Sequence, residues 1–151
     1  MKLELSVLAN NKDTAAEPIF AAIDIGSNSF HLIVARLEHG EIRPLHVLAE
    51  KVQLGKGLKD HRLTAEAIER GIACLERFQQ LLLSVKPQQV RAVGTNALRQ
   101  AWNRNDFTEP AEAILGTPID VIYGREEARL VYLGVAHTLS DDEKSRLVVD
   151  I

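Results

Sequence analysis

The feature that most constrains the fold is a pair of apolar, strand-like runs interrupted by a short polar loop, AAIDIGSNSFHLIVAR, at residues 21–36. Both runs are rich in Ile, Val and Phe, which favours β-strands over 19–25 and 30–38. A tight hairpin between them would need only two residues, such as Asn-Gly. The loop instead carries a carboxylate, a glycine and three small polar residues, so it offers more hydrogen-bonding groups than a turn needs.

After this pair, strand-like and helix-like patterns alternate along the chain. A third strand follows the tight His39-Gly40 turn, and Thr64 caps a helix that continues to about Val85. The remaining elements are predicted as strands over 41–50, 90–93, 119–123 and 146–151, and as helices ending near 102, over 107–115 and over 125–139. This pattern predicts an α/β fold: a mixed five-stranded sheet in the order β-β-β-α-β-α-β-α, with one further strand beyond it.

Composition places the chain among globular proteins and removes several classes of function. Its 151 residues are 46% hydrophobic and 26% charged with a net charge of −3, so no basic field indicates a nucleic-acid partner. Cys74 is the single cysteine, which excludes an internal disulfide and predicts a buried, unreactive thiol in the helix capped by Thr64. Because no apolar run is long enough for a signal peptide or a membrane helix, we expect a soluble, cytoplasmic protein.

The interrupting loop has the residue types of a phosphate and cation site. Gly26 permits close approach of the backbone to a ligand. Ser27, Asn28 and Ser29 add hydrogen-bond donors that suit an anion. Asp24, at the strand end, can hold a divalent cation between itself and a phosphate. A plain hairpin with an Asx turn accounts for the same residues equally well.

A second loop of similar type lies at GTNALRQ, residues 94–100, where a strand passes into a helix. Gly94, Thr95 and Asn96 stand at a helix N-terminus, which favours anions. Arg99, in the first turn, opposes the helix dipole unless it holds a ligand. Taken alone, this motif is explained more simply by an N-cap from Thr95 or Asn96 and a solvated Arg99.

The third motif, GREEARLVYLG at 124–134, begins a helix with two adjacent glutamates. Apolar residues at i, i+3, i+4 spacing form one stripe on this helix: Ala128, Val131, Tyr132, Val135, Ala136 and Leu139. Glu127 flanks the stripe while Glu126 lies further round, so Glu127 is the better candidate for a general base. Taken alone, two acidic residues in a first turn only complement the helix dipole. Leu130 and Leu133 lie off the stripe, which indicates that the helix is covered on a second side as well.

Together these motifs resemble the exopolyphosphatase/guanosine pentaphosphate phosphohydrolase family, within the superfamily of actin, sugar kinases and heat-shock chaperones. The matching stretches are 21–36, 93–101 and 124–135, and the final LVVDI matches the strand that leads into a second phosphate loop. The resemblance implies a ribonuclease-H-like lobe that faces a second lobe across a phosphate-chain substrate and a divalent cation, Mg²⁺ or Mn²⁺.

The resemblance also implies a role for each motif. Asp24 and Asp150 are the expected carboxylates on the cation, and Glu127 is the residue expected to activate water. The expected phosphate-binding residues are Gly26, Ser27, Asn28, Ser29, Gly94, Thr95, Asn96 and Arg99. The implied reaction is release of terminal orthophosphate from inorganic polyphosphate, or conversion of guanosine pentaphosphate to the tetraphosphate.

The family continues beyond the Asp-Ile pair with a Gly-rich loop and a second lobe, so this chain is expected to be an N-terminal lobe that is inactive alone. Its expected parts are a flexible extension (1–17), the phosphate-binding lobe (18–139), and a linker with the first strand of the second lobe (140–151). The apolar final strand predicts a homodimer formed by segment exchange. Two other functions fit the motifs: an ATP-dependent kinase or ATPase lobe of the same superfamily, and a non-catalytic sensor of phosphate-rich ligands.

Overall fold

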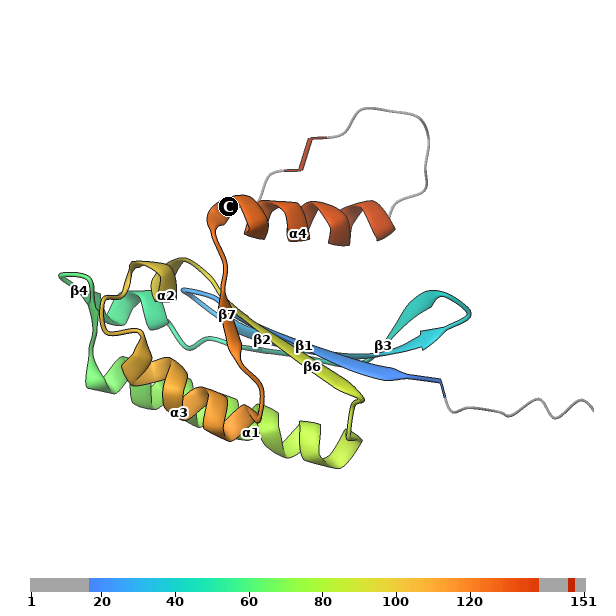
Figure 1. Ribbon diagram of the computed structural model, residues 1–151, viewed down its shortest axis with the longest axis horizontal. Coiled ribbons are helices and arrows are strands. Elements are labelled where there is room, and N and C mark those ends of the chain that lie inside the picture. The colour runs from blue at the N-terminus through green and yellow to red at the C-terminus, as the bar shows by residue number, and fades with distance from the viewer. Residues whose placement is uncertain (1–16, 139–146, 149–151) are drawn as a thin grey trace, which may run out of the picture.

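The computed structural model describes residues 17–138 and 147–148 (Figure 1). The strands are β1 (Ile19–Ile25), β2 (Phe30–Glu38), β3 (Glu41–Glu50), β4 (Leu58–Lys59), β5 (Arg62–Leu63), β6 (Gln89–Gly94) and β7 (Ile119–Val121). The helices are the 3₁₀ turn η1 (Leu54–Gly57), α1 (Ala65–Val85), α2 (Asn96–Gln100), α3 (Asn105–Leu115) and α4 (Gly124–Thr138).

Five strands form one sheet in the order β3-β2-β1-β6-β7. The pairs β1–β2 and β2–β3 are antiparallel, whereas β1–β6 and β6–β7 are parallel. The parallel pairs need crossover connections, which α1, α2 and α3 supply. The predicted mixed five-stranded sheet and its order of elements are therefore confirmed, and the bounds predicted for the first three strands agree with the structure.

Alternation along β1 and β2 sends one set of side chains into the core and the other set to the opposite face. The paired core residues, all buried, are Ala21 with Val34, Ile23 with Leu32, and Ile25 with Phe30. Helices α1 and α3 lie against this face of the sheet (Figure 1). The core therefore lies between the sheet and these two helices.

Helix α1 begins as predicted, because the Thr64 hydroxyl accepts a hydrogen bond from the Ala67 N–H at 3.3 Å. Its packing against α3 is close: a Cβ added to Gly71 would lie 2.6 Å from Cε2 of Phe107. Cys74, on the same helix, is fully buried, which confirms the predicted buried thiol. Burial raises the pKa of the Cys74 thiol to about 12, so the thiolate is disfavoured.

Helix α4 lies on the other side of the sheet from α1 and α3 (Figure 1). The predicted apolar stripe is not buried: Ala128, Tyr132 and Ala136 are exposed. Leu130 and Leu133 are also at least one-third exposed. The covering of this second side, expected from a lobe that follows, therefore stays a prediction. Helical spacing identifies the side of a helix suited to burial, but whether anything covers that side depends on tertiary packing.

Several shorter elements differ from the predictions. The strand predicted over 119–123 ends at Val121, since the chain turns there and the Tyr123 carbonyl accepts from the N–H groups of Glu126 and Glu127 in α4. Helix α3 begins at Asn105, two residues before the predicted 107. The turn η1 and the two-residue strands β4 and β5 were not predicted, because elements this short show no periodicity.

The predictions for the two chain ends concern residues that the structure does not describe. Residues 1–16, 139–146 and 149–151, which include Leu139 and Asp150, lie outside the described residues. Residues 147–148 have no regular structure. The final strand, the three-part domain division and the homodimer by segment exchange therefore stay predictions. Among the described helices, none combines the length and apolar character that crossing a bilayer requires.

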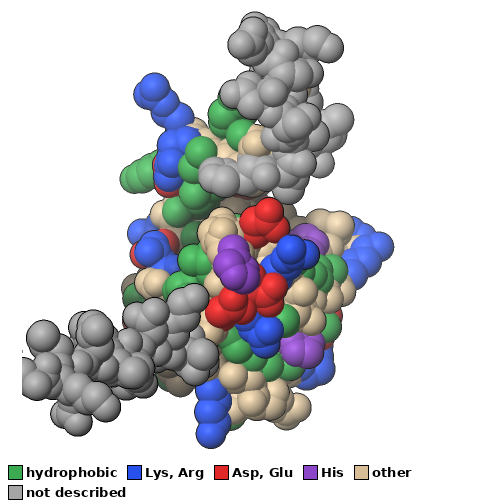
Figure 2. Space-filling view, turned by 90° about the vertical axis from the view of Figure 1, so that its right-hand side faces the viewer, with side chains coloured by type: hydrophobic (Ala, Val, Ile, Leu, Met, Phe, Trp, Pro, Cys, Tyr) green, Lys and Arg blue, Asp and Glu red, His purple; other side chains and the backbone are tan. Residues whose placement is uncertain are grey.

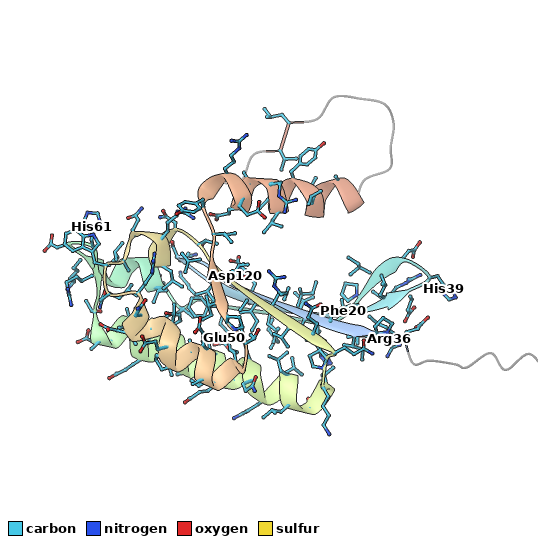
Figure 3. All side chains as sticks on the ribbon, viewed as in Figure 1. Phe20, Arg36, His39, Glu50, His61 and Asp120 are labelled. Carbon is cyan, nitrogen blue, oxygen red and sulfur yellow. The ribbon has the colours of Figure 1, made fainter. Side chains whose placement is uncertain are left out.

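The two ends of the sheet differ in their chemistry. Figure 3 shows Phe20, Arg36 and His39 at one end, and His61 at the other, beside α2. At the β2–β3 tip, Glu38 accepts from Arg36 at 3.2 Å and lies 3.7 Å from Arg43. Acidic, basic and histidine side chains mingle on this end of the surface (Figure 2). Because these charges pair with one another, the motif loops at the opposite end are the better candidate for an anion site.

Candidate functional site

The motif loops meet at one edge of the sheet, where β1, β6 and β7 have their carboxyl ends. Ile25 pairs with Gly94, and Gly94 pairs with Val121, so the segments that follow these strands are neighbours. Ligands of open α/β sheets bind outside this edge. The structure thus brings together the three motifs that lie about 70 and 30 residues apart in the sequence.

The first loop closes on itself. The Gly26 N–H donates to the Ser29 carbonyl at 3.2 Å, so this group is engaged within the loop. A Cβ on residue 26 would lie 2.7 Å from that same carbonyl oxygen, which no real side chain tolerates. Gly26 is therefore required by the closure of the loop itself.

Two other segments hold this loop in place. The Asn28 carbonyl accepts from the Gln53 N–H, and the Ser27 carbonyl accepts from the Gly55 N–H, each at 2.8 Å. The Ser27 hydroxyl accepts from the Ala97 N–H, at the start of α2, at 3.1 Å. Ser27 thus caps a helix that begins about 70 residues later, while its own hydroxyl proton stays available to donate.

This tie corrects the simpler explanation of the second motif. Thr95 occupies the N-cap position of α2 but makes no side-chain cap bond; its hydroxyl donates to the Ile25 carbonyl at 3.5 Å. The Asn96 side-chain oxygen accepts from Gln100 at 2.9 Å. Capping is therefore supplied by Ser27, from a distant part of the sequence.

Arg99 joins the second and third motifs at this edge. Its Nη1 donates to the Ile122 carbonyl at 2.6 Å and to Oε2 of Glu127 at 3.3 Å. Its Nη2 donates to Oδ1 of Asn96 at 3.4 Å. The Arg99 side chain is only 25% exposed, so the alternative of a solvated arginine is wrong. Arg99 fixes the end of β7 and the start of α4 relative to α2.

The two glutamates at the start of α4 point in different directions. Glu127 reaches Arg99 and the sheet edge. Glu126 binds the Arg129 guanidinium through both oxygens, at 2.7 and 2.8 Å, on the outer side of the helix. Hydrogen bonding to Arg129 lowers the pKa of the Glu126 carboxyl. Of the two carboxylates, only that of Glu127 adjoins the motif loops.

Asp24 lies at the end of β1, with Oδ1 buried and Oδ2 3.7 Å from Nδ1 of His31. Within residues 17–138 and 147–148, no three His, Cys, Asp or Glu side chains are grouped closely enough to hold a metal ion. Mg²⁺ usually takes one or two carboxylates and completes its shell with water and substrate phosphate. The carboxylate of Asp24 fits such a partial site, while Asp150 lies outside the described residues.

Sequence reasoning missed the residues that position the loops. The N–H groups of Gln53, Gly55 and Ala97 fix the first loop, and Tyr123 lies at the turn into α4. The glycines of the polar stretch after β3 gave a signal for a close backbone approach, since a Cβ on Gly55 would lie 3.0 Å from that of Ser27. The other contacts join distant residues and leave no local pattern.

The sheet order, the helices and the site at the strand ends define the chain as a lobe of the actin, sugar kinase and heat-shock chaperone type. The model of the Ppx/GppA phosphatase family matches residues 33–151. The chain belongs to this family.

Solved structures support the same assignment. The Aquifex aeolicus PPX-GPPA enzyme is 34% identical, with a TM-score of 0.75 over 81% of this chain and 41% of that one. An exopolyphosphatase from Cytophaga hutchinsonii is 30% identical, with a TM-score of 0.74 over 78% of this chain and 38% of that one. An exopolyphosphatase-like protein is 32% identical, with a TM-score of 0.79 over 84% and 39%. The chain thus spans about two-fifths of the length of these relatives.

Proposed function

We propose that the chain is the N-terminal lobe of an exopolyphosphatase, which releases terminal orthophosphate from inorganic polyphosphate and also converts guanosine pentaphosphate to the tetraphosphate. The observation that supports this most directly is the 3.3 Å contact between Arg99 and Glu127 beside the first loop. A cation for phosphate and a carboxylate for water are there within one hydrogen bond of each other. The names of the related exopolyphosphatases agree with this reading.

In this proposal Arg99 binds an oxygen of the terminal phosphoryl group and so brings that group next to Glu127. Oε2 of Glu127 accepts the proton of a water molecule while the water oxygen attacks phosphorus. The bond from phosphorus to the bridging oxygen breaks, and that oxygen keeps the electron pair as the new chain end. The products are orthophosphate and a chain shorter by one unit.

The remaining residues of the site bind and orient the substrate. The hydroxyl proton of Ser27 and the exposed side chain of Asn28 are the donors of the first loop that face away from its closure. Asp24 would hold Mg²⁺ or Mn²⁺, which neutralises charge on the phosphate chain when bound. Charge has to be stabilised on both sides of the transferred group, so we expect the 151-residue chain alone to hydrolyse polyphosphate at or near background.

The test uses a form in which this lobe is followed by a second lobe of the kind the relatives have. Phosphate release is measured from polyphosphate, guanosine pentaphosphate and ATP. Glu127→Gln is expected to lower kcat by about a hundredfold or more, with substrate binding largely retained, since a general base acts on the transition state. Glu126→Gln is the matched control and should stay close to the unmodified enzyme.

Three results would overturn the proposal. Release of phosphate from ATP alone would point to an ATPase or kinase lobe. A larger loss of kcat in Glu126→Gln than in Glu127→Gln would remove Glu127 as the base. Binding of polyphosphate without any hydrolysis in the two-lobed form would instead favour the sensor.

A further inference from the structure

A polar pocket lies beside the candidate site, between α2, α3 and β7. It has a volume of about 450 Å³, and the residues that line it are Arg99, Arg104, Asn105, Thr108, Ile119, Val121 and Tyr123. Ligand pockets typically measure roughly 300–1,000 Å³. The pocket is therefore too large for a single orthophosphate and large enough for several linked phosphate groups.

The charge of this pocket suits an anion. Arg99 and Arg104 both line it, and no carboxylate is among the described residues that do so. Arg99 already contacts Glu127, but the exposed guanidinium of Arg104 makes no ion pair with any residue in 17–138. Asn105 and Thr108 add neutral hydrogen-bonding groups on the same side of α3.

Nearby acidic side chains are occupied elsewhere. Asp106 accepts from the side chain of Asn103 at 3.0 Å, and Glu112 accepts from the Ile119 N–H at 2.8 Å. Asp120 pairs with Arg91 at 2.8 Å. None of these three carboxylates forms an ion pair with Arg104 among the described residues.

The pocket and the candidate site share one residue, Arg99, which both contacts Glu127 and lines the pocket. A chain with its terminal phosphate at Glu127 can therefore continue past Arg99 towards Arg104. One guanidinium group can bind two oxygens of the same phosphate through two N–H groups. Arg99 followed by Arg104 along the pocket therefore suits two successive or nearly successive phosphates.

We propose that this pocket is a subsite for the phosphate groups that follow the one being released, with Arg104 as their principal binding residue. The ligand class is a linear phosphoanhydride chain. The inference rests on the proposed function, which places the terminal phosphate at Glu127 and the rest of the chain in the pocket. Because a free inorganic chain and a nucleoside polyphosphate share this chemistry, the experiment has to separate them.

Binding is measured by calorimetry on the 151-residue chain at one fixed ionic strength, with long-chain polyphosphate, tripolyphosphate, orthophosphate and guanosine triphosphate as probes. Arg104→Gln should weaken binding of the long chain by about tenfold, the loss expected for one partly exposed charge-assisted contact. It should leave orthophosphate binding unchanged. Arg62→Gln is the control, since Arg62 is also an exposed arginine but does not line the pocket.

The outcomes separate the subsite from the proposed function. If Arg104→Gln weakens the binding of the longer phosphate chains only, the subsite is supported, even if a two-lobed form shows no hydrolysis. If guanosine triphosphate is affected as strongly as the long chain, the subsite takes the phosphates next to the terminal one. Equal effects of Arg104→Gln and Arg62→Gln, or no binding of any chain by the unmodified protein, would overturn the subsite. In that case hydrolysis that depends on Glu127 would still support the proposed function without the subsite.

Discussion

Replacement of Ser27 by alanine tests whether the first loop is held by the α2 helix start. The change removes the oxygen that accepts from the Ala97 N–H at 3.1 Å, and Ala97 itself is buried. A lost N-cap costs roughly 0.5–2 kcal/mol, and a buried unsatisfied donor roughly 1–3 kcal/mol. Ser27 is partly exposed, so water can reach part of the space, and we expect a loss of about 1–2 kcal/mol in the free energy of unfolding.

The assay is equilibrium unfolding in urea together with amide hydrogen exchange. The midpoint should fall while the slope with urea stays unchanged, because the exposed surface is the same. Exchange at the Ala97 N–H should become about tenfold faster, the factor that corresponds to roughly 1.4 kcal/mol.

Ser29→Ala is the matched control in the same loop. Ser29 contributes its backbone carbonyl to loop closure, and alanine keeps that group. We expect a change within about 0.5 kcal/mol, as for an ordinary surface substitution. Equal stability of Ser27→Ala and the unmodified protein would refute the tie, and so would a loss in Ser29→Ala as large as that in Ser27→Ala.

Two further changes test the packing and the electrostatics of α1. Gly71→Ala gains about 1 kcal/mol of helix propensity but puts a Cβ 2.6 Å from the buried Phe107 ring, and overpacking costs about 1–3 kcal/mol. Urea unfolding should show a net loss; a gain would mean that the ring has room to move. Hydrogen bonding to Arg77 lowers the pKa of the Glu50 carboxyl from its usual 4.5. The pair therefore stabilises the fold at pH values above 4.5, and this stabilisation is lost as the pH falls through the lowered pKa of the folded state. Arg77→Gln should therefore cost up to about 1 kcal/mol at neutral pH and nothing in strong acid; a difference that persists in acid would contradict this.

The elements that could be predicted from the sequence are those with a local signal. Strands β1 and β2 are short apolar runs rich in residues that favour strands, and α1 has both a helical period and the Thr64 cap. The strands β4 and β5 have two residues each and no period to detect. For α4 the spacing predicted a helix correctly, but it could not say that its apolar side would remain exposed.

The candidate site shows the same division. The loops after β1, β6 and β7 could be expected at one edge, because parallel strands end together. The pairing of Arg99 with Glu127 and of Ser27 with Ala97 joins residues 28 and 70 positions apart, and no local pattern encodes such distances. The roles assigned to these residues in phosphate release stay predictions.

The parallel pairing of β1 with β6 has a consequence for synthesis of the chain. The β1–β2–β3 meander needs only partners nearby in sequence, whereas β1 waits for β6, about 70 residues later, to become an internal strand. At about 5–20 residues per second, a ribosome needs roughly 4–14 s to supply them. During these seconds β1 has a free edge with unpaired backbone groups, which is the kind of surface that joins one nascent chain to another. A chain that is halted before Gly94 therefore exposes the strand that the finished sheet protects best.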